Sequence, residues 1–440
     1  MTEREARTDV AAFLRKVETT DAVIGVVGLG YVGLPVAMSF AEEGFRVHGV
    51  DLDEARVSAL RNGETYLGDV PAEQIQRLTS SHRFTAGSDY ERLREADAVL
   101  ISVPTPLLDG APDLSHVIAC GKSLATVLRP NTLVILESTT YPGTTQDLLA
   151  PLLEQSGMVA GEDFFLAFSP ERIDPGNPIY NFRDIPKVVG GVNEHSTKAA
   201  LKLYESVLPK VFTVSGPKEA ELAKLIENTF RHVNIALVNE LAVYAHDMGV
   251  DIWESIEAAA TKPFGFMPFW PGPGWGGHCI PLDPVYLSYR VRKDHAHEVR
   301  FVELAHAVNA EMPKHVVERS ALLLNKGGKA VRGAKILGVG VAYKGGTEDT
   351  RGSAAFKVLN ELSDRGAEIY YHDPLLPQID LADGKHSSVE MSSELLSNMD
   401  LAVIFVNQGG VDWDVLTTGP CPVLDCCNAV RIRSSKVERL

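Results

Sequence analysis

Cys279 follows four glycines and two prolines in the segment Pro271-Gly-Pro-Gly-Trp-Gly-Gly-His-Cys279. This composition predicts a shaped loop through to Asp283, rather than a helix or a regular strand. Such a backbone can approach a ligand closely, and a thiol held there can attack an aldehyde. Outside such a pattern, a lone cysteine is more often an inert core residue. Asp283 lies four residues further on and could activate water.

A cysteine nucleophile suits the oxidation of a primary alcohol to a carboxylate. The first hydride transfer gives an aldehyde, which has no second hydride to give until a nucleophile adds to it. A thiolate would form a thiohemiacetal, whose carbon can lose hydride and become a thioester that water then cleaves. We expect His278 to have a structural or substrate-contact role, and we expect the following residues to contact the substrate: Phe269, Gly274, Trp275 and Gly276.

Oxyanions develop in these steps, and they require a fixed cation or amide nearby. Lys224 and Asn228 are four residues apart, on one face of a long predicted helix, and are suitable donors. A lone lysine usually lies on a solvated face. Here the surrounding face carries apolar residues, which favours a site.

A second pattern, Gly28-Leu29-Gly30-Tyr31-Val32-Gly33, indicates a dinucleotide. It follows a predicted strand and opens a helix. Its first glycine permits a tight turn, the second allows a pyrophosphate to approach, and the third lets helix pack on strand. The alternative is a sharp turn without a ligand. Asp51 ends the next predicted strand, where an acid binds the adenine ribose and favours NAD over NADP.

Other residues complete the expected cofactor site. Asp53 is the fallback for the ribose role, although we favour a helix cap, and Arg56 is expected at the cofactor. Ser102-Val-Pro104-Thr105-Pro106 ends another strand, and ligands bind beyond the carboxyl ends of such strands. Pro104 and Thr105 would then line the cleft, unless the loop is only rigidified by proline.

Alternation of apolar strand and helix patterns predicts an α/β fold. We expect an accessory helix in residues 1–20, a dinucleotide-binding domain in 21–215, a helical region in 216–328 and a second, smaller α/β domain in 329–440. Residues 217–249 follow helical spacing, and a helix of about 45 Å would outrun one domain. The fold class is therefore two Rossmann-like, doubly wound parallel-sheet domains joined by a long central helix and a helical middle region.

Composition excludes several classes of protein. A net charge of −16, from 58 acidic and 42 basic residues, argues against general affinity for nucleic acid or anionic membranes. We see no membrane span and no signal peptide. Five irregularly spaced cysteines predict reduced thiols in a cytoplasmic protein. Cys421, Cys426 and Cys427 lack metal-site spacing, so we expect core cysteines and no metal.

From Val23 to about Asp425 the chain resembles the UDP-glucose/GDP-mannose dehydrogenases, which oxidise a nucleotide sugar by four electrons. The match with this family is carried by the glycine motif with Asp51 and by Glu137-Ser-Thr-Thr-Tyr-Pro-Gly-Thr144, Ser169-Pro-Glu-Arg172, Glu221-Leu-Ala-Lys-Leu-Ile-Glu-Asn228, Gly276-Gly-His-Cys-Ile-Pro-Leu-Asp283 and Tyr343-Lys-Gly-Gly-Thr-Glu-Asp-Thr-Arg351.

The resemblance implies a role for each matched position. Cys279 resembles the nucleophile, Lys224 and Asn228 the oxyanion donors, and Asp283 the acid that supports water or the thiol. Glu171 resembles an acid linked to thioester hydrolysis, with Arg172 beside it at the substrate. Thr139 resembles a threonine near the nicotinamide, with Thr140 as a possible substitute. Lys344 resembles a lysine at the substrate diphosphate, and Arg351 would serve the cofactor cleft. The carboxy-terminal domain would bind the UDP half, and the long helix would form a homodimer.

Several departures from the family pattern indicate which subgroup the chain resembles. Arg172-Ile-Asp174 replaces a segment with a second glutamate, and Arg351-Gly-Ser-Ala354 replaces Arg-Glu-Ser-Pro. No arginine of the UDP-glucose type is evident near residues 262–266. The remaining motifs are closest to the UDP-N-acetylhexosamine subgroup, and UDP-glucose stays open as the substrate because some UDP-glucose enzymes could share these motifs. Two alternatives remain: a two-electron hydroxyacid-type dehydrogenase, which would not need Cys279, and a nucleotide sensor without turnover.

Overall fold

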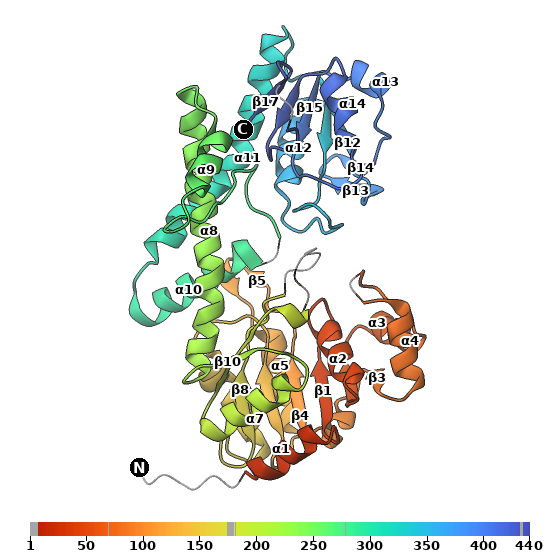
Figure 1. Ribbon diagram of the computed structural model, residues 1–440, viewed down its shortest axis with the longest axis vertical. Helices are drawn as coiled ribbons and strands as arrows, with labels where there is room; N and C mark the ends of the chain where they lie inside the picture. Colours follow the sequence, from red (N-terminus) through yellow and green to blue (C-terminus); the bar gives the residue numbers. More distant parts are fainter. Residues whose placement is uncertain (1–7, 69, 174–179, 181, 278, 432–433) are drawn as a thin grey trace. The chain divides into compact units, whose positions relative to one another are not determined.

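The computed structural model describes residues 8–68, 70–173, 180, 182–277, 279–431 and 434–440. The chain divides into two compact units. The first unit contains residues up to Glu227 together with Val285–Ala296, and the second contains Asn228–Pro284 and His297–Leu440. Each unit is built around its own sheet (Figure 1).

The first unit is an α/β sandwich. In the described part of the chain, its sheet has eight strands in the order β10-β9-β8-β7-β4-β1-β2-β3. Neighbouring strands are parallel except for the β8–β9 pair, which is antiparallel. The bounds of these strands are β1 Val23–Val27, β2 Arg46–Val50, β3 Phe84–Gly87, β4 Ala98–Ile101, β7 Leu133–Leu136, β8 Phe165–Phe168, β9 Lys187–Gly191 and β10 Val211–Thr213. A small hairpin pairs β5 Leu107–Leu108 with β6 Ala111–Pro112.

Helices cover both faces of this sheet, which explains why β1, β4, β7 and β8 are buried at every position. One apolar core takes side chains from α1 to α4 and α7, and the other from α5 and α6. The bounds are α1 Val10–Glu18, α2 Gly33–Glu42, α3 Glu54–Arg61, α4 Ala72–Ser80, α5 Ser115–Ala125, α6 Ala150–Leu153 and α7 Glu194–Glu205. Short 3₁₀-helical segments are η1 Tyr90–Glu95, η3 Glu154–Ser156 and η4 Phe182–Asp184, and η2 Thr144–Leu149 is a short π-helix.

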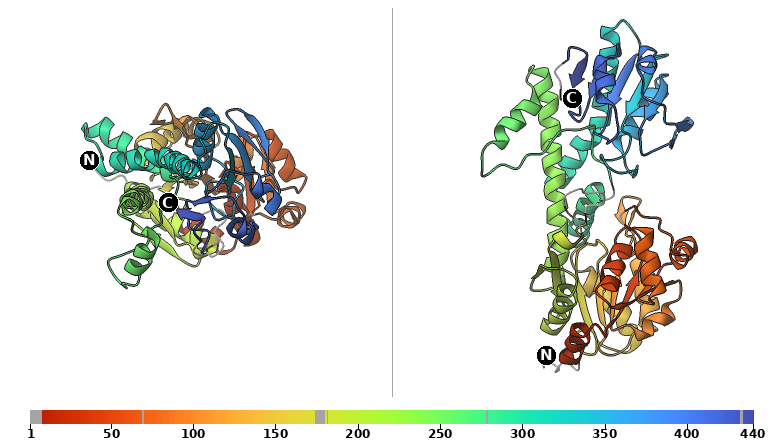
Figure 2. Two further views of the ribbon diagram at one scale, coloured as in Figure 1. Left: turned by 90° about the horizontal axis from the view of Figure 1, so that it is seen from above. Right: turned by 45° about the vertical axis from the view of Figure 1, so that its right-hand side comes forward.

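Helix α8, Pro217–Asp247, has 31 residues and would be about 46 Å long. It runs without a break (Figure 2), and the division between the two units falls within it, after Glu227. The expectation that this helix outruns one domain is therefore confirmed.

The expectation of a loop through to Asp283 is wrong, because helix α10, Cys279–His295, begins at the cysteine. Pro281 lies in the first turn, where an amide hydrogen has no partner within the helix, so proline is tolerated there. Only the residues before Cys279 form the glycine-rich loop.

The second unit holds a smaller sheet, which in the described residues is fully parallel, in the order β12-β11-β15-β16-β17. Its strands are β11 Lys335–Val339, β12 Glu368–His372, β15 Leu401–Ile404, β16 Val423–Asp425 and β17 Val437–Arg439, and a hairpin pairs β13 Gln378–Leu381 with β14 Gly384–Ser387. Helices α11 and α12 pack on one face, and α13 and α14 on the other. The helices are α9 Ile252–Ala260, α11 Arg300–Lys326, α12 Ala354–Asp364, α13 Ser393–Ser397 and α14 Trp413–Thr418.

The α/β class with two parallel sheets is confirmed. No helix in the described ranges combines the length and the apolar character that crossing a membrane would need. Cys120, Cys421 and Cys426 are buried free thiols, as expected for core cysteines, whereas Cys427 is only half-buried.

Candidate active site

The glycine turn after β1 has the geometry that its sequence predicts. Gly28 has a φ of 89°, and a Cβ there would lie 2.5 Å from the Ser102 carbonyl oxygen. A Cβ on Gly33 would lie 1.8 Å from the Gly28 oxygen. By contrast, a Cβ on Gly30 would meet no atom within 4 Å. The first and third glycines are thus required by the fold, while the second leaves open space where a pyrophosphate could approach.

Asp51 lies directly after β2 and beside this turn. Its carboxylate accepts the N–H of Leu29 at 2.7 Å and that of Asp53 at 2.9 Å, and the Arg56 guanidinium lies 3.5 Å away. Asp53 itself caps α3 by accepting the N–H groups of Ala55 and Arg56, which confirms the helix-cap interpretation. Asp51 is therefore the acid fixed at the turn.

The other residues of the turn differ in exposure. The Leu29 side chain is fully buried and Val32 precedes the first residue of α2, whereas Tyr31 is half-exposed. The buried residues hold the turn in place, and Tyr31 lies on its outer surface.

The loops after β4 and β7 are bonded to each other. The Thr105 hydroxyl donates to the Thr139 carbonyl oxygen at 2.9 Å, and the Tyr286 hydroxyl on α10 donates to the Thr105 carbonyl oxygen at 2.5 Å. Pro104 is exposed on this loop. Thr139 is half-buried, whereas the buried Thr140 hydroxyl has no hydrogen-bond partner in the described residues. The choice between the two threonines stays open.

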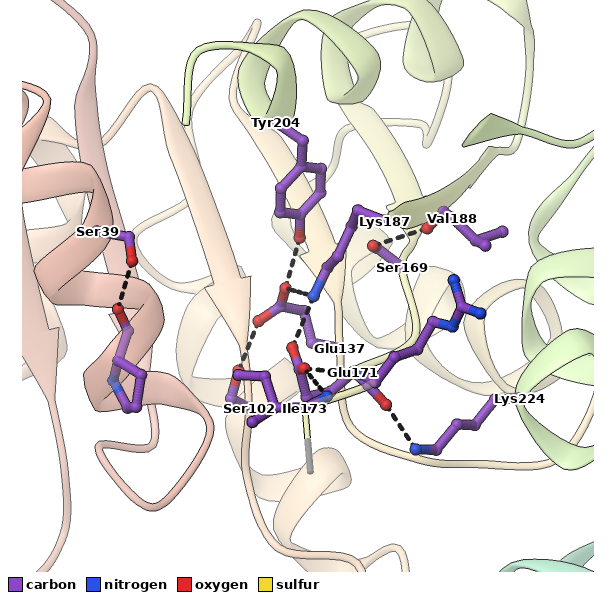
Figure 3. A network of polar contacts seen from close by, with 12 residues as sticks. Ser39, Ser102, Glu137, Ser169, Glu171, Ile173, Lys187, Val188, Tyr204 and Lys224 are labelled. Atoms are coloured by element: carbon purple, nitrogen blue, oxygen red, sulfur yellow. Dashed lines mark hydrogen bonds and ion pairs between the residues drawn. The ribbon is translucent and has the colours of Figure 1, made fainter. Parts of the chain in front are cut away.

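A buried polar network lies at the carboxyl ends of β7 and β8 (Figure 3). The Lys187 ammonium lies 2.8 Å from a Glu137 carboxylate oxygen and 2.7 Å from one of Glu171. Tyr204 and Ser102 also donate to Glu137, at 2.6 and 2.9 Å. Burial would raise the pKa of Glu171, but the charge and hydrogen bond of Lys187 outweigh it and lower that pKa. Glu171 is therefore held as a carboxylate.

Lys224 is buried against this network. Its ammonium donates to the main-chain oxygen of Glu171 at 2.6 Å, and its side chain is 8% exposed. The solvated-face alternative for Lys224 is therefore wrong. Arg172, next to Glu171, pairs with Glu227 at 2.7 Å and donates to the Pro186 oxygen at 2.6 Å.

Glu221, one turn before Lys224 on α8, fixes the Glu137–Thr144 segment. Its carboxylate accepts the N–H of Gly143 at 2.5 Å and both the N–H and the hydroxyl of Thr145, at 2.9 and 2.7 Å. Burial raises the pKa of Glu221 to about 7. Helix α8 thus holds the threonine loop through Glu221 and the Glu171 loop through Lys224.

In the second unit, Asn228 donates a hydrogen bond from its side-chain nitrogen to the Asp283 carboxylate. Both side chains are buried. Asp283 lies on α10, four residues after Cys279, which is the first residue of that helix. The Cys279 side chain and His278 lie outside the described residues.

The loop before Cys279 is fixed at several points. The Gly277 N–H donates to the Arg351 main-chain oxygen at 2.9 Å, and a Cβ on Gly276 would lie 2.8 Å from the Cβ of Tyr343. The Gly272 N–H donates to Asn239 on α8 at 2.9 Å. The close approach of Tyr343 explains why positions 276 and 277 need glycine, since a Cβ at either would lie 2.8 Å from it.

Aromatic rings support the same loop. Trp275 is 9% exposed, and its ring centroid lies 5.4 Å from that of His232 and 5.0 Å from that of His306. Gly274 has a φ of 129°, which favours glycine. Phe269 packs edge-on to Phe230 at 5.6 Å.

Two predicted cations belong to the second unit. The Lys344 ammonium lies 5.6 Å from the centroid of the Tyr343 ring. Arg351 is exposed and pairs with Asp349 at 2.6 Å. Their contacts to substrate and cofactor stay predictions. In the part of the chain that the structure describes, no group of three or more His, Cys, Asp or Glu residues could hold a metal ion.

Comparison with known proteins identifies these features as those of a family. Residues 22–208, 218–311 and 337–431 match, in turn, the NAD binding, central and UDP binding domains of the UDP-glucose/GDP-mannose dehydrogenase family. The chain belongs to this family. It is therefore an NAD-dependent oxidoreductase that acts on a CH–OH group and carries a UDP-sugar-binding domain.

Several similar relatives are named as dehydrogenases of UDP-N-acetylhexosamines. A UDP-N-acetyl-D-mannosamine dehydrogenase of Pyrococcus horikoshii is 34% identical over 89% of this chain and 91% of its own length. A UDP-N-acetyl-D-glucosamine 6-dehydrogenase of Pseudomonas aeruginosa is 36% identical over 80% of this chain and 83% of its own. A solved UDP-D-ManNAc dehydrogenase from Pyrococcus horikoshii has a TM-score of 0.84 at 31% identity and covers 95% of this chain and 98% of its own. The placement beside UDP-N-acetylhexosamine dehydrogenases is confirmed.

Several residues that shape the site in this family member escaped the sequence analysis. Lys187, Tyr204 and Tyr286 each lie in an apolar or mixed segment whose pattern carries no functional signal. Glu221 lies in a matched motif, but its buried carboxylate could have been inferred only from its spacing to Lys224.

Proposed function

We propose that this protein is a UDP-N-acetylhexosamine 6-dehydrogenase that oxidises the sugar's primary alcohol to a carboxylate through a thioester on Cys279. The buried amide of Asn228, bonded to Asp283 four residues beyond the cysteine, is the observation that supports this most. A buried amide fixed by a carboxylate is a preorganised donor, which is what a developing oxyanion requires.

The geometry of the glycine turn in the first unit supports NAD as the cofactor. The open space at Gly30 and the carboxylate of Asp51 beside the same turn match a pyrophosphate and a ribose hydroxyl. The reaction would use two molecules of NAD, bound one after the other, and each would accept one hydride. Arg56, Pro104, Thr105 and Thr139 would border it, and Arg351 would complete the site.

The chain's own residues would carry the remaining steps. The first oxidation removes a hydride and the hydroxyl proton and leaves an aldehyde. The Cys279 thiolate adds to the aldehyde carbon, and the oxyanion so formed accepts hydrogen bonds from Lys224 and Asn228. Loss of the second hydride leaves a thioester. Water, oriented with the help of Asp283 and Glu171, then releases the acid and the thiol.

Substrate binding is assigned to both the loop and the second unit. We assign contacts with the sugar and its diphosphate to Arg172, Phe269, Gly274, Trp275, Gly276 and Lys344. The UDP half is assigned to residues 329–440, the cofactor to 21–215 and the connecting helices to 216–328, with residues 1–20 as an accessory segment. The three family domains, which match residues 22–208, 218–311 and 337–431, support this assignment.

A homodimer is supported by exposed apolar side chains on α8 in the second unit and on Met248, which directly follows that helix. Leu237 is 50%, Leu241 45%, Tyr244 55% and Met248 70% exposed. They recur at intervals of three or four residues and form one stripe, which is a surface that proteins usually cover. Sedimentation of the purified protein at several concentrations tests this, with a dimer expected.

Product analysis tests the proposed function. The protein is incubated with NAD and, separately, with UDP-N-acetylglucosamine, UDP-N-acetylmannosamine and UDP-glucose, while NADH and sugar acid are both counted. We expect two NADH per acid formed, with an N-acetylhexosamine preferred. One NADH per product would favour the hydroxyacid-type alternative, and binding without turnover would favour the sensor.

A further inference from the structure

A lysine in the first unit is buried between two carboxylates. Lys187, the first residue of β9, is 3% exposed, and its ammonium lies 2.8 Å from Glu137 and 2.7 Å from Glu171. Figure 3 shows the ammonium reaching between the two acids, which follow β7 and β8. A buried ammonium is costly unless it is paired, and here it is paired twice.

The charges of this cluster balance only when Lys187 is counted. The groups that face one another are the carboxylates of Glu137 and Glu171, the ammonium groups of Lys187 and Lys224, and the Tyr204 phenol. Two negative and two positive charges then sum to zero. Without Lys187, two buried carboxylates would share one cation, which favours protonation of one of them.

Glu137 and Glu171 make different contacts in this cluster. Glu137 accepts hydrogen bonds from Tyr204 and Ser102 as well as the Lys187 ion pair, so it is a fixed counter-charge. Glu171 accepts the N–H groups of Arg172 and Ile173 at 2.7 and 2.6 Å on one oxygen, and Lys187 on the other. Its carboxylate is thus bound to its own loop on one side and to β9 on the other.

The position of Glu171 affects Lys224 through the main chain. The Glu171 carbonyl oxygen accepts the Lys224 ammonium at 2.6 Å. Since the carbonyl direction is set by the loop, and the loop is held by the carboxylate, a shift of Glu171 would move the acceptor that orients Lys224. A misplacement of about 1 Å can cost about a hundredfold in rate.

We propose that Lys187 is a positioning residue for the oxidation, because it holds Glu171 as a carboxylate and thereby directs Lys224. The inference rests on the proposed function, in which Lys224 stabilises the oxyanions. Lys187 lies within the sheet of the first unit and is remote in sequence from the glycine turn.

The pH profile separates this role from mere support of the fold. In Lys187→Met the paired acids repel each other, and Glu171 or Glu137 takes up a proton near neutral pH. The turnover number should fall by roughly tenfold to a hundredfold at pH 7, and recover in part as pH rises and the lost carboxylate ionises. This rise should come on top of any change in the wild-type profile, since Glu171 is already ionised in the wild type.

The experiment compares the wild type, Lys187→Met, Lys187→Arg and the double variant Lys187→Met/Glu137→Gln between pH 6 and 9. We measure kcat, KM for NAD and for the UDP-sugar, and thermal unfolding. We expect the KM for NAD to change by less than about twofold, since the Asp51 turn is untouched. The double variant removes one charge of each sign, so its profile should return towards the wild-type shape. Lys187→Arg keeps the charge and should keep that shape.

The outcomes are distinct. If Lys187→Met is folded and its profile runs parallel to the wild type, the inference is overturned. If Lys187→Met does not fold, the other two variants decide. An alkaline rise beyond that of the wild type, in Lys187→Arg or in the double variant, contradicts the proposal. A wild-type protein that forms no acid, or only one NADH per product, defeats the proposed function instead.

Discussion

The two sheets carry the same turn after their first strand but treat the acid beside it differently. In the first unit, the Gly28 N–H bonds to Val50 at 2.8 Å and Asp51 accepts the next N–H at 2.7 Å. In the second, the Gly340 N–H bonds to His372 at 3.0 Å and Asp373 accepts the next N–H at 2.9 Å. Asp51 and Asp373 therefore occupy equivalent places.

Their surroundings differ. Gln408, which is fully buried, donates to Asp373 at 3.2 Å and accepts the Gly346 N–H at 2.6 Å. Asp373 is 2% exposed and Asp51 9%, with the partly exposed Arg56 beside it. The second acid is enclosed by the fold, whereas the first, although also buried, has a partly exposed arginine beside it. We propose that the same arrangement serves as a cofactor site in the first unit and as a structural connection in the second.

The largest expected effect is a loss of stability on replacing Asp373, the enclosed acid of the second unit. Asp373→Ala removes the acceptor of the Val341 and Leu375 N–H groups and of Gln408. Leaving such buried donors unpaired should cost about 3 kcal/mol of unfolding free energy. Urea unfolding measures this, with Asp51→Ala as the matched control. An equal loss in both variants would contradict the distinction between the two acids.

The next effect concerns the cofactor. Asp51→Ala should weaken NAD binding by roughly tenfold to a hundredfold, since a hydrogen bond to a charged group is worth about 1.5–3 kcal/mol. Binding of NADP should change less, because Asp51 repels its 2′-phosphate. Titration calorimetry with both cofactors checks this, and an unaltered preference would remove the assignment. Asp373→Ala should leave NAD affinity unchanged.

A smaller expected effect is on how the stability of the second unit changes at acidic pH. Burial and the nearby His306 lower the pKa of His232 from 6.5 to about 4. Because the unfolded chain then binds more protons between these pH values, the second unit should lose stability as pH falls from 6.5 towards 4. The loss should be about 1 kcal/mol at pH 5.5.

His232→Phe should flatten this dependence, because phenylalanine fills the space beside Trp275 without titrating. Thermal midpoints of wild type and variant from pH 7.5 to 5 provide the measurement. Parallel curves would show that His232 is not the source. Glu221 in the first unit has the opposite sign: with its pKa raised to about 7, its contribution is lost as pH rises from 4.5 through 7.

Periodicity predicted the alternation of strands and helices and the long helix in residues 217–249, which the structure contains as α8. It missed β9 and β10, whose short runs mix lysine, glycine and threonine. It also missed α10, because Pro281 and Pro284 obscure a helix that tolerates one proline in its first turn and a second inside. Local patterns cannot show such tolerance.

For the site, the motifs predicted the residues that approach ligands but not those that hold them. Lys224 and Asn228 could be found because their chemistry and spacing fit an oxyanion. Lys187 and Tyr286 could not, since each acts on a residue that is distant in sequence: Lys187 on Glu137, and Tyr286 on Thr105. Only the folded chain brings these pairs together.

The central claim, that the carbonyl carbon must take up the sulfur of Cys279 before the second oxidation, is tested by Cys279→Ala. The variant is incubated with NAD and the preferred UDP-sugar, and sugar acid and NADH are counted. We expect sugar acid to be undetectable while NAD affinity stays at the wild-type value. Formation of the acid at the wild-type rate, with two NADH for each, would contradict the account.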